Sequence, residues 1–439
     1  MQRYRVLGAL SLVVSAGAAC TTRDASAPGD GGSSDGPALV RDAGVSPTVD
    51  VAEPGEAGLP SGPCRYGVAP RRLLEPPRGA DDPVFAWTGL EYGLLWRDYR
   101  DTRPGENTRT ELYFQRLSRQ GILQGSATRV TTGTGFGATA PRLVWTGASY
   151  VAVYARDGKL YRLVLDAQGA PQSDPTPLVG GREAELAVTG STVGLAWMTA
   201  PDVLEKPADC PTCFYRAQEI WFAILPATGS FTAPAAPLDS ARWPVHPAEP
   251  GSDYFRRTHL LARGAGFSLA WFRQVERQPS QLRQVVLDAR GSPTRTRDLA
   301  LPGVTRFRHA WDGRDLAVLY RAGEKLPVRL HLAPEGGPEG DTSIGEGAVQ
   351  DLFFGPDGLD LLWIDVRHPM PVTLSRRSTT GAVRPLFEGP ESGYPTDERF
   401  RILPIDAGYA FLWYGAPTPK SKTDLQPAGL WFFTTGCNR

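Results

Sequence analysis

Short runs of β-branched and aromatic residues alternate along this chain with tight turns, and one such unit recurs. In Trp87–Trp96 a Trp-Thr-Gly turn leads into an apolar run that ends in an aromatic residue, and Trp145–Tyr154 repeats this order. Alternating apolar runs joined by a turn that contains Gly predict a β-hairpin. An aromatic residue closes each of seven copies, spaced roughly 50 residues apart: Trp96, Tyr154, Trp197, Trp271, Tyr320, Trp363 and Trp413.

Two further strand-like segments follow most hairpins. Leu160–Leu165 leads into an Asp-Ala-Gln-Gly turn, and the shorter run Thr176–Val179 follows that turn. Four short antiparallel strands per unit, with no helical periodicity, are typical of a β-propeller. We therefore predict an all-β fold, a seven-bladed β-propeller of four-stranded antiparallel blades. Six or eight blades are alternatives, because the step from Trp197 to Trp271 is long, whereas a tandem array of β-sandwiches would repeat at about 100 residues.

The ring is expected to close by pairing its two ends. The last repeat has only three strand-like segments before the chain ends, and Tyr66–Leu74 fits the missing fourth strand. An N-terminal strand that joins the C-terminal blade would remove two exposed sheet edges. Cys64 and Cys437 would then flank this junction, so we predict a disulfide between them.

The first residues predict an export signal. Arg3 and Arg5 precede an apolar run that ends at Ala19, directly before Cys20, and this order resembles a bacterial lipoprotein signal. An ordinary secretory signal is the alternative. We expect a signal peptide over residues 1–19, a lipid on Cys20, and a Gly-, Ser-, Ala- and Pro-rich disordered tether over residues 20–63 before the propeller at 64–439. By analogy with such lipoproteins, Thr21 favours the outer membrane of a Gram-negative bacterium, facing the periplasm or the cell surface.

The composition of the chain limits the kinds of partner that we expect the protein to bind. Lys and Arg number 47, as do Asp and Glu, so the chain lacks the basic field of a nucleic-acid-binding protein. We expect the protein to contact the membrane through the lipid on Cys20, and to be a monomer without a cofactor. The remaining cysteines, Cys210 and Cys213, predict a second disulfide in an oxidising compartment. A redox motif or a zinc half-site is the alternative, but no closely paired histidines complete a metal site.

Candidate binding residues follow from propeller topology. Loops between second and third strands, and between blades, emerge on one face, and such loops often carry function. The longest segments fall there: Arg97–Glu111, Met198–Glu219, Asp239–Arg257, Phe387–Phe400 and Tyr414–Ala428. Charged and polar residues at the loop–strand junctions near the predicted centre are ligand-binding candidates: Arg97, Asp98, Arg142, Arg156, Glu185, His259, Arg308, Asp351, Asp365 and Arg401. Arginines in such a group would suit an acidic sugar, a peptide or a phosphate.

The region from Cys64 to Cys437 resembles uncharacterised β-propeller lipoproteins of Gram-negative bacteria, whose repeats carry the same Trp-Thr-Gly-x-x-Tyr hairpin. The resemblance implies the fold and an envelope location, and it transfers no catalytic residue. We expect a lipid-anchored scaffold that binds an envelope protein or a glycan through its long-loop face. The alternative is a carbohydrate-active hydrolase or lyase on the same scaffold, with acids drawn from Asp98, Glu185, Asp351 and Asp365.

Overall fold

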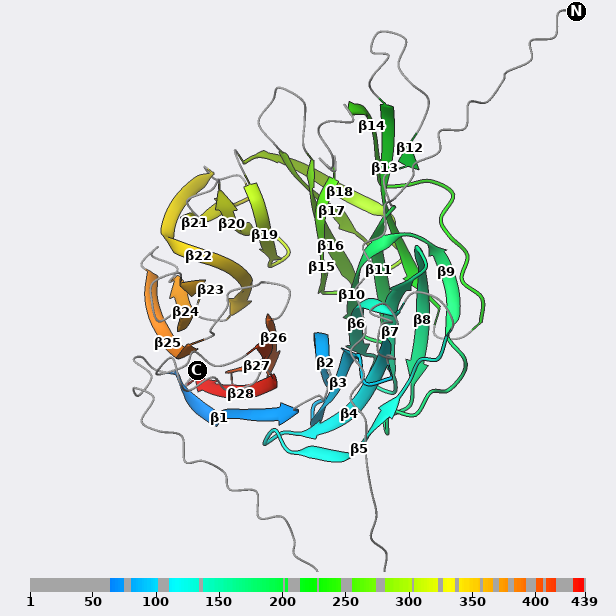
Figure 1. Cartoon of the computed structure of the whole chain (residues 1–439). Coiled ribbons are helices and arrows are strands. Elements are labelled where there is room, and N and C mark those ends of the chain that lie inside the picture. Colours follow the sequence, from blue (N-terminus) through cyan, green and yellow to red (C-terminus); the bar gives the residue numbers. More distant parts are fainter. Residues whose placement is uncertain are drawn as a thin grey trace, which may run out of the picture. The chain divides into compact units, whose positions relative to one another are not determined.

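The fold is taken from a computed structural model (Figure 1). It describes residues 64–437 except 75–79, 102–109, 134–136, 200–201, 204–213, 227–228, 246–254, 274–280, 302–303, 323–326, 336–338, 356–357, 366–370, 378–382, 392–399, 406–407 and 416–428. The predicted signal peptide, the tether, Cys20 and the Cys210–Cys213 pair lie outside the described residues. Contacts divide the chain after Gly55, and every described strand belongs to the second unit. Within the described residues no helix could cross a membrane.

In the described part of the chain, 28 strands form seven antiparallel blades, which confirms the predicted fold. Blades 1 to 3 comprise β2 (Ala80–Trp87), β3 (Glu91–Asp98), β4 (Glu111–Ser118) and β5 (Leu123–Arg129); β6 (Thr139–Trp145), β7 (Tyr150–Arg156), β8 (Lys159–Leu165) and β9 (Thr176–Gly180); and β10 (Arg182–Thr189), β11 (Thr192–Met198), β13 (Phe214–Leu225) and β14 (Asp239–Val245), with β12 (Asp202–Val203) also paired to β13.

Blades 4 to 7 complete the ring. They comprise β15 (Phe255–Arg263), β16 (Gly266–Arg273), β17 (Gln281–Leu287) and β18 (Pro293–Ala300); β19 (Val304–Trp311), β20 (Leu316–Ala322), β21 (Pro327–Ala333) and the first half of β22 (Gly340–Gly355); the second half of β22 with β23 (Gly358–Asp365), β24 (Pro371–Arg377) and β25 (Val383–Glu391); and β26 (Phe400–Ile405), β27 (Gly408–Gly415), β28 (Gly429–Cys437) and β1 (Cys64–Leu74). The 16-residue β22 is the fourth strand of blade 5 and the first strand of blade 6.

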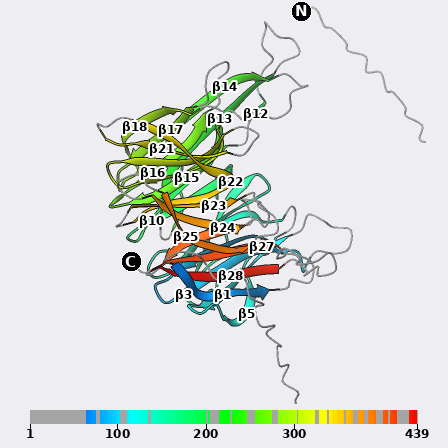
Figure 2. The same ribbon diagram turned by 90° about the vertical axis from the view of Figure 1, so that its left-hand side faces the viewer.

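The first strands meet around the centre of the ring. They contact one another in the order β2, β6, β10, β15, β19, β22 and β26, and β26 returns to β2. Figure 1 looks toward this centre, and Figure 2 shows the same blades from the side. The ring closes as predicted, because β1 pairs with β28 and places Cys64 opposite Cys437.

A separate hydrophobic cluster fills each blade interface, and the closing aromatics explain this arrangement. Trp96 of blade 1 packs with Phe432 of blade 7, and Tyr154 of blade 2 packs with Phe114 of blade 1. The other five closing aromatics likewise lie in the cluster shared with the preceding blade, and all seven are buried. The repeat in the sequence therefore records a contact between neighbouring blades.

Close packing at these interfaces also explains a glycine of the repeat. A Cβ atom on Gly93 would lie 2.3 Å from the Tyr150 ring and 2.9 Å from the Phe114 ring. Glycine at this position therefore leaves room for the Tyr150 ring of blade 2 next to the backbone of blade 1. Gly194 occupies the corresponding position in blade 3, where a Cβ would lie 2.8 Å from Phe267.

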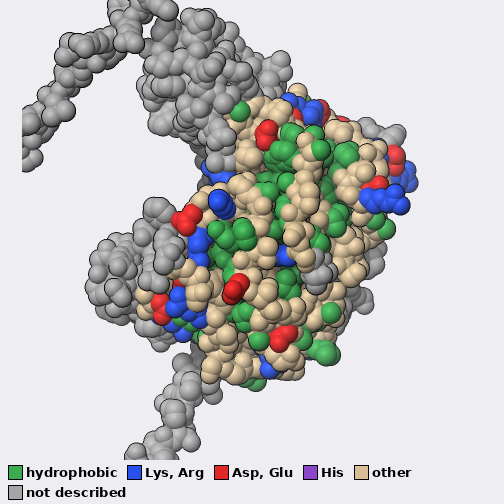
Figure 3. All heavy atoms as spheres, turned by 90° about the vertical axis from the view of Figure 1, so that its right-hand side faces the viewer, with side chains coloured by type: hydrophobic (Ala, Val, Ile, Leu, Met, Phe, Trp, Pro, Cys, Tyr) green, Lys and Arg blue, Asp and Glu red, His purple; other side chains and the backbone are tan. Residues whose placement is uncertain are grey.

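The outer surface of the propeller carries both acidic and basic side chains. Figure 3 shows acidic and basic side chains scattered among hydrophobic and neutral ones on one outer side, without a continuous field of either sign. This distribution agrees with the equal numbers of acidic and basic residues.

The register of the closing strands makes the Cys64–Cys437 disulfide testable. Directly opposed residues in an antiparallel pair have Cα atoms about 4.5–5.5 Å apart, within the range that a disulfide spans. We expect non-reducing peptide mapping to recover the two cysteines in one linked peptide. Reduction should lower the free energy of unfolding by roughly 2–5 kcal/mol. Recovery of both cysteines as free thiols would contradict the prediction.

Candidate functional site

Six of the predicted residues occupy one register position and lie together at the centre of the ring. In each blade this position of the first strand pairs with the residue just before the closing aromatic. We call these residues the axial cluster: Arg142, Glu185, His259, Arg308, Asp351 and Arg401. Val84 holds the position in blade 1. The prediction placed the six residues at junctions before the first strands; the structure corrects this, because they lie within those strands.

Backbone irregularities precede the axial position in most blades. Register shifts in β2, β6, β10 and β22 end at the axial residue itself. Four residues that lie two positions before the axial residue have positive φ angles of 47–52°: Asp82, Ala140, Glu183 and Arg257. Bulges of this kind redirect the side chains that follow, and strained non-glycine residues concentrate at functional sites.

Arg142 and Glu185 form the best-defined pair of the cluster. Arg142 Nη2 donates to Glu185 Oε1 at 3.0 Å, across the interface of blades 2 and 3. Their side chains are 25% and 21% exposed, so solvent still reaches them. Arg142 and Arg308 also share one local geometry, because each donates from Nη1 to the carbonyl oxygen of the preceding residue, at 3.0 and 3.1 Å.

The charges of the cluster perturb one another. Burial raises the pKa of Asp351 to about 6, and nearby Glu185 adds to the rise while Arg308 opposes it. Burial and, to a smaller extent, repulsion by Arg142 and Arg308 together lower the pKa of Arg401 to about 10. Glu185 and Asp82 oppose this lowering of the Arg401 pKa, so charges of both signs act on one another at the centre.

His259 shares this environment. Burial, His309, Arg308 and Arg142 together hold the pKa of His259 well below its usual value. The axial cluster therefore combines cationic arginines, carboxylates and a neutral imidazole. The described residues contain no group of three or more His, Cys, Asp or Glu side chains arranged to bind a metal ion.

Arg97 and Asp98 lie outside the axial cluster. Arg97 Nη2 contacts Asp81 at 2.6 Å, and its Nε lies 3.5 Å from Asp82, so it neutralises charges on the first strand of blade 1. Asp98 is buried and accepts hydrogen bonds from Trp96 Nε1 at 2.9 Å and from Arg100 Nη2 at 2.6 Å. These contacts give Asp98 a structural role in the blade and separate it from the other proposed acids.

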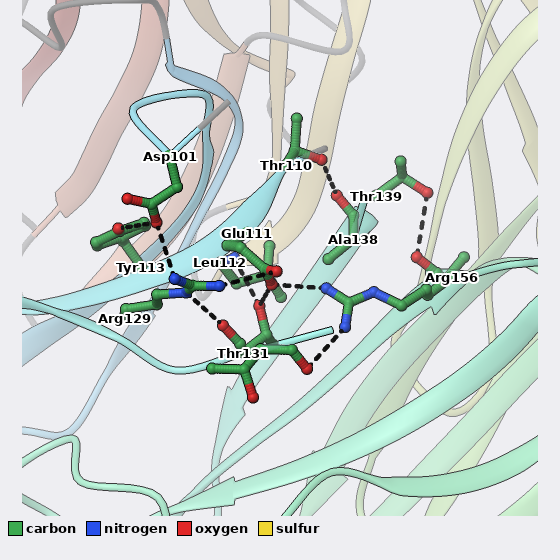
Figure 4. A network of polar contacts seen from close by, with 12 residues as sticks. Asp101, Thr110, Glu111, Leu112, Tyr113, Arg129, Thr131, Ala138, Thr139 and Arg156 are labelled. Carbon is green, nitrogen blue, oxygen red and sulfur yellow. Dashed lines mark hydrogen bonds and ion pairs between the residues drawn. The ribbon is translucent and has the colours of Figure 1, made fainter. Parts of the chain in front are cut away.

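Arg156 likewise belongs to a buried network between blades 1 and 2 (Figure 4). Its Nη2 donates to Glu111 Oε2 at 2.6 Å, and Thr131 donates to the same oxygen at 2.6 Å. Arg129 Nη2 donates to Glu111 Oε1 at 3.1 Å. The Glu111 carboxylate therefore holds two guanidinium groups, and Arg156 is bound within the protein. Asp365 is the last candidate; its backbone pairs with Gly347, and its side chain lies outside the described residues.

Other groups were missed from the sequence. A cavity of about 230 Å³ lies at the opposite, turn end of the first strands of blades 4 to 7. Its lining includes Asp360 and Arg376, a buried ion pair with a contact of 3.0 Å, and Tyr409, whose hydroxyl donates to Asp360.

A second group that the sequence analysis did not find is a buried hydrogen-bonded chain of His309, Ser268 and Gln284, which reaches His259. The sequence does hold a signal for these groups, because each places polar residues at repeat positions that are apolar in most other blades.

Several solved structures show a distant similarity to this chain. A protein of unknown function from Dyadobacter fermentans matches with 8% identity and a TM-score of 0.42, covering 86% of this chain and 100% of the other. The phage phi92 endosialidase matches with 8% identity and a TM-score of 0.44, covering 85% and 70%. A subtype N10 neuraminidase-like protein of A/little yellow-shouldered bat/Guatemala matches with 8% identity and a TM-score of 0.35, covering 86% and 100%.

These likenesses are too distant to transfer an activity, because one scaffold hosts many unrelated functions. No family model matches the chain, and no curated protein sequence matches it. The blades themselves define the class, a seven-bladed β-propeller. Function has to be argued from the axial cluster.

The Glu111 network gives a stability prediction. Glu111→Ala should lower the free energy of unfolding by about 3–5 kcal/mol, because it leaves two guanidinium groups without their shared carboxylate. Arg295→Ala is the control, since Arg295 and its partner Glu335 are 37% and 50% exposed and their ion pair should contribute at most about 1 kcal/mol. Denaturant unfolding measures both changes. Equal losses in the two variants would contradict a structural role for the network.

Proposed function

We propose that the protein is a lipid-anchored cell-envelope binding protein whose propeller holds the anionic group of an acidic glycan at the axial cluster. The observation that carries this proposal is the convergence of Arg142, Arg308 and Arg401 from three separate blades. A bound anion would offset the repulsion that Arg142 and Arg308 exert on Arg401, whose pKa is lowered to about 10 by burial and by this repulsion together. Guanidinium groups bind carboxylates in a planar, bidentate manner.

The carboxylates of the cluster favour a sugar over a simple anion. Glu185 and Asp351 lie beside the arginines, where their oxygens would accept hydrogen bonds from ligand hydroxyl groups. An acidic sugar offers both a carboxylate and several hydroxyls on one rigid ring. This pairing of donors and acceptors supports an acidic glycan as the ligand class.

The envelope location rests on the N-terminal sequence. The basic start, the short apolar run and Cys20 support a lipid anchor, and residues 20–63 would tether the propeller to an outer membrane. A protein partner bound by the long loops would be compatible with this arrangement. Most residues of those loops lie outside the described part of the chain.

Binding of D-glucuronate, with D-glucose as the uncharged counterpart, tests the proposal by calorimetric titration. The unaltered protein should bind D-glucuronate at least about tenfold more tightly than D-glucose. Arg308→Val should weaken D-glucuronate binding by about tenfold or more. The variant should still fold, because the fold already accepts Val84 at this register position.

Arg295→Val provides the matched control, since it removes one arginine away from the axial cluster and should leave binding unchanged. Equal affinity for both sugars, or unchanged D-glucuronate binding by Arg308→Val, would contradict the proposal.

A glycoside hydrolase is the second candidate function, and it is supported by the two carboxylates of the axial cluster, Glu185 and Asp351. Burial raises the pKa of Asp351 to about 6, with a further rise from Glu185, whereas Arg142 pairs with Glu185. Two carboxyl groups in one site, one of which has a raised pKa and can act as an acid, are the arrangement that glycosidic cleavage uses. Of the four proposed acids, Glu185 and Asp351 are the two that lie in the axial cluster.

This alternative predicts a pH dependence. Asp351 would act as the general acid, so activity should fall as the pH rises through about 6, where its proton is lost. Asp351→Asn should abolish the release of reducing ends from polygalacturonate. A protein that binds D-glucuronate but releases no reducing ends between about pH 4 and pH 8 would reject the hydrolase and leave the binding function.

A further inference from the structure

Three buried polar residues interrupt the apolar pattern where blades 4 and 5 meet. His309 follows the axial residue of blade 5, and this position is apolar in every other blade: Phe85, Leu143, Leu186, Leu260, Leu352 and Ile402. Ser268 and Gln284 also occupy positions that are mostly apolar or glycine elsewhere in the repeat. Both side chains and that of His309 are at most 1% exposed. Buried polar groups of this kind require hydrogen-bond partners.

The three residues form one hydrogen-bonded chain that ends at the axial cluster. Gln284 Nε2 donates to Ser268 Oγ at 2.8 Å, and Ser268 Oγ lies 3.0 Å from His309 Nε2. His309 Nδ1 lies 3.0 Å from Nδ1 of His259. The backbone N–H of His309 also donates to His259 Nδ1, at 3.2 Å. The chain therefore runs from β17 through β16 and β19 to β15.

The backbone contact fixes the direction of the chain. Because a backbone N–H can only donate, Nδ1 of His259 must be an acceptor. His309 must then donate to it from Nδ1–H, which leaves Nε2 of a neutral His309 as an acceptor for the Ser268 hydroxyl. Ser268 in turn accepts from Gln284. Each hydrogen bond thus has one donor and one acceptor, and the neutral His259 carries its proton on Nε2.

We infer that His259 is a neutral hydrogen-bond donor of the axial cluster, that its Nε2–H binds an oxygen of the ligand's anionic group, and that His309, Ser268 and Gln284 are its positioning residues. The part that concerns the ligand rests on the proposed function. Within the described residues no hydrogen-bond partner of His259 Nε2 is found, and the His259 side chain keeps partial solvent exposure.

The charge state and burial of the two histidine rings agree with the assignment of His259 as a neutral donor. Burial lowers the pKa of His309 to about 3, although a hydrogen bond with the backbone of Ser268 opposes the shift, and the pKa of His259 is also well below its usual value. Both rings are therefore neutral near pH 7. A neutral donor beside Arg308 and Arg142 adds a directed hydrogen bond without adding to the repulsion among the arginines. An oxyanion satisfies all three donors together.

Nitrogen NMR of the ¹⁵N-histidine-labelled protein tests the positioning chain without any ligand. His259 should be protonated on Nε2 alone, and His309 on Nδ1 alone. Ser268→Ala removes the donor to His309 Nε2 but keeps the backbone donor to His259 Nδ1, so both tautomers should persist while the His309 Nε2 resonance shifts. The variant should fold, because Ala317 and Ala410 occupy this position in blades 5 and 7. A His259 ring protonated on Nδ1, or a His309 Nε2 resonance that is unchanged in Ser268→Ala, would overturn the inference.

Titration with D-glucuronate tests the donor role. His259→Leu should weaken binding by about tenfold, whereas His259→Gln, which keeps an N–H group, should retain more of the affinity. Ser268→Ala should weaken binding several-fold, and Ser375→Ala, which alters another buried serine in blade 6, should not. Unchanged binding by His259→Leu would overturn the donor role. No D-glucuronate binding by the unaltered protein would contradict the proposed function, and the NMR result decides separately on the positioning chain.

Discussion

Packing of each closing aromatic against the preceding blade is the interaction on which the rest of the structure depends. Trp96 enters the cluster of blade 7, and Trp413 enters that of blade 6. Because every blade completes its core with a neighbour, an open row of blades would leave apolar clusters exposed at both ends. Closure by β1 removes these ends, and it buries Cys64 in the same cluster as Trp413.

The same packing explains why charged residues can gather at the centre. The apolar clusters at the blade interfaces hold the ring together, so the axial position of each first strand is free to carry Arg, Glu, His or Asp. Closure then brings these side chains close enough for Arg142 to pair with Glu185 and to repel Arg401. A site of this kind is preorganised, because the strands that carry it are fixed by seven interfaces before any ligand arrives.

The blades and the ring closure could be predicted because their signals are local: a turn glycine, an alternating run and a closing aromatic recur in each unit. The axial residues could be found for the same reason. Side-chain partners could not, because they lie far apart in the chain; Arg156 pairs with Glu111, 45 positions away, and this separates it from the site. The residues of the His309 chain are visible in the sequence as polar residues at positions that are otherwise mostly apolar in the repeat. Their hydrogen bonds could not be predicted, because they depend on the register of four strands.

The most direct test of the account is a crystal structure of the propeller with D-glucuronate. The carboxylate should lie at the axial cluster, with its oxygens about 3 Å from the guanidinium nitrogens of Arg308 and from Nε2 of His259. Hydroxyl groups of the sugar should face Glu185 or Asp351. A sugar bound elsewhere on the propeller, or an axial cluster that holds only water at a saturating concentration of D-glucuronate, would contradict the account.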